Sequence, residues 1–186
     1  DNTGVGYRAG LSTTTGARNT FIGRDAGYSN TTASYNVAMG TYTFDANTTG
    51  ANNTAVGDGA MTENTTGVQN TAVGSSAMNS CTTGSNNIAV GDGALRLNTT
   101  GATNVAVGRQ ALDANTTADR NVAVGHTVLN ANTTGASNAA VGMTAMLLNT
   151  TGSQNAAFGN SSLYNNTTAS YNTAFGGSTL YANTTG

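Results

Sequence analysis

A repeat of 17 residues runs through the whole chain without an insertion or a deletion. Each copy begins with Asn, has Gly four residues later and carries two adjacent Thr in its second half; the unit reads N-[TVA]-A-[VIF]-G-x-x-A-[LM]-x-x-N-T-T-G-x-x. We number these positions as columns one to seventeen. After Asp1, ten full copies and fifteen residues of an eleventh account for all 186 residues. The copies begin at Asn2, Asn19, Asn36, Asn53, Asn70, Asn87, Asn104, Asn121, Asn138, Asn155 and Asn172.

The length of the repeat excludes most repeat folds. Helical repeats need roughly 30 to 47 residues, because each unit holds at least two helices. A unit of 17 residues suits one coil of a parallel β-solenoid, or β-roll, with two short strands in each of eleven coils. The first strand lies in segments such as 104–108 (NVAVG), and a second is predicted in segments such as 94–100. Coils that stack by β-pairing rise about 4.8 Å, so the sequence predicts an all-β rod on the order of 50 Å long.

Residues 1–186 are therefore predicted to form a single continuous solenoid domain. The chain begins and ends inside a repeat, so we expect it to be a segment of a longer protein. Charged residues make up 8% of the chain, its net charge is -2, and no basic run exists that would favour binding to nucleic acid. No stretch approaches the roughly 20 apolar residues that span a bilayer, so membrane insertion is not expected.

Small and large apolar residues stand side by side in two places in each copy. Column three is Ala in nine copies, whereas column four is Val, Ile, Met or Phe in all eleven, and columns eight and nine repeat this pairing, as in Ala94-Leu95. Neighbouring side chains of a strand point to opposite faces. Both faces therefore avoid water, which predicts lateral self-association. The alternative is that a turn between the paired columns directs both side chains inward.

The repeated N-x-A-V-G segment resembles the N-S-V-A-I-G signature of the head domains of trimeric autotransporter adhesins. The longer unit, as in NTAVGDGAMTENTTG at 53–67, is similar to repeats of phage tail fibres and of large secreted proteins of aquatic microbes. The resemblance covers the whole chain and implies a left-handed solenoid that associates as a trimer. It also implies an extracellular location, on a cell or virion surface. Adhesin head repeats are shorter, however, and have no counterpart of the N-T-T half.

The N-T-T segments form the most suggestive polar column. Each Asn there is an N-x-T acceptor for N-glycosylation if the chain is secreted by a glycosylating cell. The alternative is a stack of Asn side chains that bond to one another from coil to coil. The candidates are Asn30, Asn47, Asn64, Asn98, Asn115, Asn132, Asn149, Asn166 and Asn183, and Asn52, Asn160 and Asn165 also fit the acceptor pattern.

The invariant Asn and Gly of the first half are interpreted as structural residues. We expect a turn or ladder role for column one and column five, because Gly permits the positive φ of a tight turn. The residues chosen to represent these columns are Asn53, Asn70, Asn87, Asn104, Asn121, Gly57, Gly74, Gly91, Gly108 and Gly125.

The sequence shows no catalytic constellation. Cys81 and His126 are each the only residue of their kind, so together they make no zinc site, and the acidic residues form no calcium-binding pattern. We expect no enzyme activity, no metal and no cofactor.

The favoured function is the structural shaft of an extracellular or virion fibre whose length is set by the number of repeats. The alternative is a glycan-binding adhesin or a receptor-binding module of a tail fibre, since seven Tyr gather toward the two ends of the chain. Ice binding by a Thr array is a remote third possibility. Self-association is expected laterally, end to end, or both.

Overall fold

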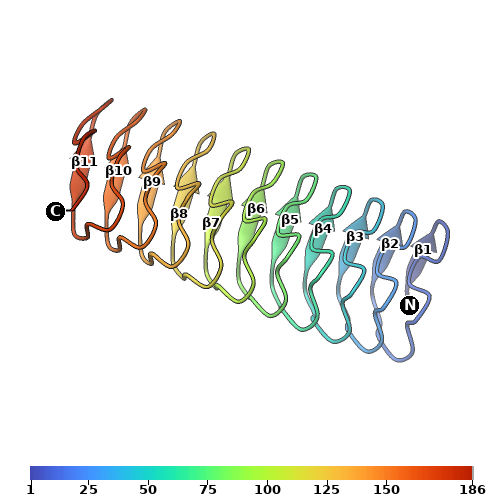
Figure 1. Ribbon diagram of the computed structural model, residues 1–186. Coiled ribbons are helices and arrows are strands. Elements are labelled where there is room, and N and C mark those ends of the chain that lie inside the picture. Colours follow the sequence, from blue (N-terminus) through green and yellow to red (C-terminus); the bar gives the residue numbers. More distant parts are fainter. Residues whose placement is uncertain (186) are drawn as a thin grey trace.

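Each copy of the repeat forms one coil of a parallel β-solenoid, as Figure 1 shows for the computed structural model, which describes residues 1–185. The strands lie in chain order in one parallel sheet, and the two ends of the chain lie at opposite ends of the rod. The predicted fold class is thus confirmed. The strands are β1 (Thr3–Val5), β2 (Thr20–Ile22), β3 (Val37–Met39), β4 (Thr54–Val56), β5 (Thr71–Val73), β6 (Ile88–Val90), β7 (Val105–Val107), β8 (Val122–Val124), β9 (Ala139–Val141), β10 (Ala156–Phe158) and β11 (Thr173–Phe175).

Every residue of strands β1 to β10 pairs with the residue 17 positions further along the chain. In β3, β4 and β5, for example, Ala38 lies opposite Ala55 and Ala55 lies opposite Ala72. The same register continues outside the strands, where the Thr48 N–H donates to the Thr65 carbonyl oxygen at 3.1 Å. Each column of the repeat is therefore one stripe along the rod.

The Gly of column five ends each strand for two reasons. Gly91 has φ +137°, and a Cβ atom built on it would lie only 2.5 Å from the Gly108 carbonyl oxygen. A side chain in this column would be strained and would also push the next coil away. Both constraints hold in the first ten copies, and Gly176 of the last copy retains the positive φ, at +120°.

The second strand predicted for each coil does not form, and residues 94–100 are turn and bend instead. The reason is column nine, where Leu95 has φ +50° and reverses the direction of the chain. Such a conformation costs a bulky residue on the order of 1–3 kcal/mol. Full burial of the Leu95 side chain contributes about as much in the opposite direction.

The turn places columns eight and nine on the same side. Ala94 and Leu95 are both fully buried, so the alternative of a turn that directs both residues inward is correct for this half of the coil. In the strand half, side chains alternate as expected, with Ala89 buried and Val90 exposed. The core of the rod is therefore one stripe of small residues from column three facing Ala and Leu or Met from columns eight and nine.

The first two coils exchange the sizes of these core residues. Phe21 stands in column three, where most coils have Ala, and Gly10 and Gly27 stand in column nine, where most have Leu or Met. A Cβ atom built on Gly27 would lie 2.5 Å from the Phe21 ring, and one on Gly10 would lie 2.7 Å from it. The Phe21 ring thus fills the space that two column-nine side chains would occupy.

Candidate functional site

The outward side of the sheet carries a row of apolar side chains along the rod. We call it the strand face; it consists of the side chains of columns two and four in all eleven strands. Column four is apolar throughout, and Ile88 and Val90 of β6 are 43% and 37% exposed. Val122 and Phe158 are exposed to a similar extent. Because column four is apolar in every strand of one parallel sheet, these side chains form a row along the rod, which distinguishes them from scattered apolar residues on an ordinary surface.

The Asn side chains of column twelve lie inside the coil. Asn64 Nδ2 donates to Asn47 Oδ1 at 2.8 Å and to the Gly67 carbonyl oxygen of its own coil at 3.3 Å. Asn47 Nδ2 donates in the same way to Asn30 Oδ1 at 2.9 Å. Eight of the nine candidate glycosylation residues are fully buried, and Asn183 of the last coil donates to Asn166 Oδ1. The amide nitrogens are enclosed, so the folded coil matches the Asn ladder and has no room for a sugar there.

Column one forms a second ladder of amides. The Asn53 N–H donates to Asn36 Oδ1 at 2.9 Å, while Asn53 Nδ2 crosses the coil to the Gly67 carbonyl oxygen at 2.9 Å. Asn70, Asn87, Asn104 and Asn121 repeat both bonds. The Gly67 carbonyl oxygen therefore accepts from one amide of each ladder, and these bonds hold the two halves of the coil together.

Cys81 interrupts the column-twelve ladder. Its single S–H donates to the Gly84 carbonyl oxygen at 3.5 Å, so no donor remains for the preceding coil, and Asn64 Oδ1 there is buried without a hydrogen-bond partner among residues 1–185. On the other side, Asn98 Nδ2 lies 3.9 Å from Cys81 Sγ. Burial raises the pKa of the Cys81 thiol to about 11, so the sulfur is neutral at ordinary pH. A buried neutral thiol is a poor nucleophile.

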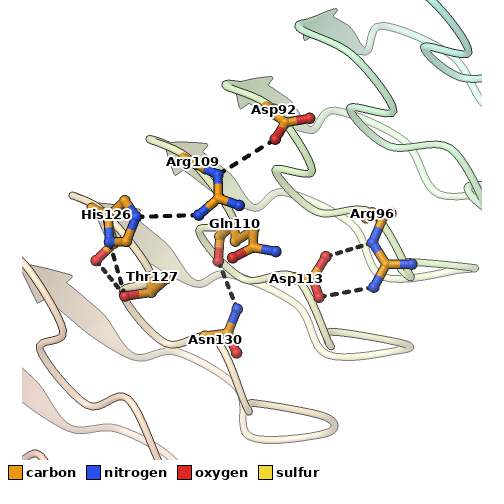
Figure 2. Close-up of polar contacts among 8 residues, drawn as sticks. All are labelled: Asp92, Arg96, Arg109, Gln110, Asp113, His126, Thr127 and Asn130. Carbon is orange, nitrogen blue, oxygen red and sulfur yellow. Dashed lines mark hydrogen bonds and ion pairs between the residues drawn. The ribbon is translucent and has the colours of Figure 1, made fainter.

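The variable columns carry polar contacts along the outside of the middle coils, which Figure 2 shows. Arg109 lies between Asp92, at 3.5 Å, and the exposed His126, whose Nε2 is 3.5 Å from Arg109 Nη1. Arg96 makes two bonds to Asp113, at 2.8 and 3.0 Å. Solvent-exposed pairs of this kind contribute about 0–1 kcal/mol each. We assign His126 no chemistry beyond these contacts.

A cluster of charged and aromatic residues in the first three coils was missed by the sequence analysis. Arg8 and Asp25 stand in the same column of neighbouring coils, and Arg8 Nε donates to Asp25 Oδ1 at 2.6 Å. The signal was present in the sequence as opposite charges 17 residues apart.

Residues 1–185 contain no pocket and no group of three or more His, Cys, Asp or Glu side chains placed to hold a metal ion. Across the same residues, no helix is long and apolar enough to cross a membrane.

The fold and its surfaces define a parallel β-solenoid with an apolar strand face and two internal amide ladders. Compared with models of known protein families, with curated proteins and with solved structures, the chain matches none.

Proposed function

We propose that this chain is part of the structural shaft of an extracellular or virion fibre, in which coils add length and the strand face joins neighbouring chains. The observation that carries the proposal is the unbroken register over eleven strands, together with buried columns that are nearly invariant along the rod. A solenoid of this kind can gain or lose coils without redesign of its core, since each coil contacts only its neighbours.

The strand face is the surface that supports lateral self-association. A strand of three residues is about 10 Å long, and eleven strands extend about 50 Å, so the face covers on the order of 500 Å². Stable interfaces bury about 800 Å² on each partner. An interface of that size would also have to include the flanking side chains of columns six and seventeen, and every further coil enlarges the strand face by the same amount.

A second copy of the chain is the partner that fits this face best. The apolar side chains recur once per coil along a straight row, and another solenoid of the same rise presents apolar side chains at the same spacing. A trimer of left-handed coils is the arrangement suggested by the resemblance to adhesin head repeats. The proposed location on a cell or virion surface rests on the same resemblance.

The test is the mass of the chain in solution, measured by sedimentation or light scattering, for the native sequence and for Val90→Glu/Val107→Glu. We expect an oligomer for the native chain and a folded monomer for the variant, because two carboxylates would be buried in the interface. Thr100→Glu/Thr117→Glu is the matched control, since these exposed residues lie on another stripe of the same coils. A native monomer, or equal loss of association in the control, would overturn the lateral contact.

The shaft itself is tested by length. Electron microscopy of chains with added copies of residues 87–103 should show rods that lengthen by about 4.8 Å per copy. Rods whose length does not follow the number of copies would contradict the proposal.

Ice binding receives no support from the Thr columns. The hydroxyl of Thr48 in column thirteen donates to the Thr65 carbonyl oxygen at 3.1 Å, and only column fourteen is exposed. A single row of exposed Thr hydroxyls forms a line, whereas an ice-binding surface needs a flat array of several rows, so we do not propose this function.

A further inference from the structure

The first three coils contain the clearest departure from the repeat on the surface of the rod. Tyr7 and Arg24 are neighbours in column six, and Arg8, Asp25 and Tyr42 are successive residues of column seven. We call these five residues the arginine–tyrosine patch. In the coils that follow, column seven holds Gly, Ser, Gln or Thr, so the charged and aromatic side chains of this column are confined to the first three coils, whereas column six carries charges in later coils as well.

A single buried carboxylate anchors both guanidinium groups of the patch. Asp25, whose side chain is 1% exposed, accepts from Arg8 Nε at 2.6 Å through Oδ1 and from Arg24 Nε at 3.2 Å through Oδ2. The hydrogen bond from Arg8 holds the pKa of the Asp25 carboxyl below its ordinary value, with a smaller contribution from Arg24. The carboxylate is therefore charged at neutral pH and fixes the orientation of both arginines.

The outer parts of the two guanidinium groups remain available. Only Nε of Arg8 and Nε of Arg24 make hydrogen bonds to other side chains within residues 1–185, so the Nη groups have no such partner there. The two side chains are 40% and 59% exposed. A guanidinium presents its donors in a planar fork that matches a carboxylate, and prior orientation lowers the entropy lost on binding.

Aromatic rings border the free donors. Tyr7 is 66% exposed and Tyr42 is 42% exposed. The Arg8 guanidinium lies 5.2 Å from the centre of the Tyr7 ring, and the Arg24 guanidinium lies 5.3 Å from the centre of the Tyr42 ring. These cation–π contacts keep the rings beside the donors rather than free in solvent. A ligand with an apolar face of C–H groups could pack that face against such an exposed ring while its charged group binds the guanidinium.

We propose that the arginine–tyrosine patch binds an acidic saccharide, with a sugar carboxylate on the Nη groups of Arg8 and Arg24 and the sugar ring against Tyr7 or Tyr42. Both parts of such a ligand have a partner here: the carboxylate matches the donors, and the apolar face of the ring matches the aromatic side chains. The absence of a pocket in residues 1–185 suits an extended sugar chain lying on the rod. The proposal adds a ligand to the shaft function and does not depend on it.

The test is titration of the chain with oligogalacturonate, followed by calorimetry or NMR, beside a neutral oligosaccharide of the same length. Arg24→Gln removes one charged donor group and should weaken oligogalacturonate binding about tenfold, as expected for a charge-assisted hydrogen bond. Arg109→Gln is the matched control, because Arg109 is similarly exposed in column six but lies in the middle coils. It should leave binding unchanged.

A third variant changes the affinity in the opposite direction. Asp45 lies in column ten of the third coil, where burial and, to a smaller extent, repulsion from Asp25 raise the pKa of its carboxyl against the opposing attraction of Arg8. Asp45→Asn removes a negative charge near the patch and should tighten binding severalfold, which loss of structure would not do.

Three results would overturn the proposal. The first is no binding of oligogalacturonate at millimolar concentration, and the second is equal binding of the neutral sugar. The third is equal weakening by Arg24→Gln and Arg109→Gln, which would indicate attraction to cations in general. Binding of a poly-glutamate peptide as tightly as the sugar would replace the saccharide with an acidic peptide as the ligand.

Discussion

The two halves of each coil are held in place by different means. In the strand half, the backbone of neighbouring coils approaches so closely that Gly91 has no room for a side chain. In the turn half, Leu95 accepts an unfavourable φ of +50° because its side chain is buried, and the Asn ladders satisfy the carbonyl groups that the turn leaves inside. The strand half therefore requires that column five carry no side chain. The turn half requires a buried apolar side chain in column nine and hydrogen-bonded Asn side chains in the ladders.

The largest expected effect tests the close approach in the strand half. Gly91→Ala should destabilise the rod by about 4 kcal/mol or more, because the methyl group meets the Gly108 carbonyl oxygen and the φ of +137° strains the residue. Urea denaturation measures the change. Gly93→Ser is the matched control, two residues further on, where a Cβ atom has its nearest neighbour at 3.4 Å and other coils carry Ser or Gln. If both variants lose equal stability, contact between coils is not the reason for Gly in column five.

The second effect tests how the two halves share the core. Phe21→Ala should cost about 3 kcal/mol by leaving a cavity. Gly27→Leu alone should also destabilise, because the new side chain meets the Phe21 ring. The double variant restores the Ala and Leu of regular coils and should recover much of the loss, with a coupling energy of about 1–3 kcal/mol. If thermal denaturation shows that the stability lost in the double variant equals the sum of the two single losses, the side chains of columns three and nine do not compensate for each other in the core.

A smaller effect concerns the gap in the ladder of the turn half. Cys81→Asn should stabilise the rod by about 1–2 kcal/mol, because the new amide donates to Asn64 Oδ1 and accepts from Asn98 Nδ2. The midpoint of urea denaturation should rise while its slope stays constant. Cys81→Ala, which removes the thiol without adding an amide, is the control and should not stabilise. A gain in both variants would assign the effect to removal of the thiol.

The smallest effect arises where charge replaces the usual small residues of column seven. The pKa of Asp25 is lowered in the folded chain, mainly by the hydrogen bond from Arg8, so this carboxylate stabilises the fold above the unfolded pKa of about 3.9. The contribution is lost as the pH falls below that value toward the folded pKa. Melting temperatures at pH 6 and pH 3 should differ more for the native chain than for Asp25→Asn. The same difference in both would contradict this role.

The sequence predicted the strand half well and the turn half poorly. Strict recurrence of Ala between larger residues and of Gly after them predicts a short strand ending at Gly, and columns two to four form that strand in every coil. The same kind of apolar pair in Ala94-Leu95 predicted a second strand that is absent. Local patterns do not reveal that Leu95 has positive φ, because the cost is offset by burial that exists only once coils are stacked.

The sequence also left open whether the Asn residues of the N-T-T segments lie inside the coil or on its surface, because local patterns do not reveal the direction of the turn. An exposed acceptor column and a buried ladder have identical sequences, and the choice depends on which way the coil turns at Leu95. The salt bridge from Arg8 to Asp25 joins residues of adjacent coils, so it follows from the register rather than from any local motif.

The ladders also give the rod a direction. In both Asn columns the later coil donates to the earlier one, as Asn47 Nδ2 does to Asn30 Oδ1 and the Asn36 N–H does to Asn19 Oδ1. The Thr hydroxyls of column thirteen donate the opposite way, from Thr48 to the Thr65 carbonyl oxygen. Any cut across the rod therefore exposes two chemically different surfaces, and these match only when a tail meets a head. A filament assembled from such rods would be polar, with two distinguishable ends and growth rates that differ between them.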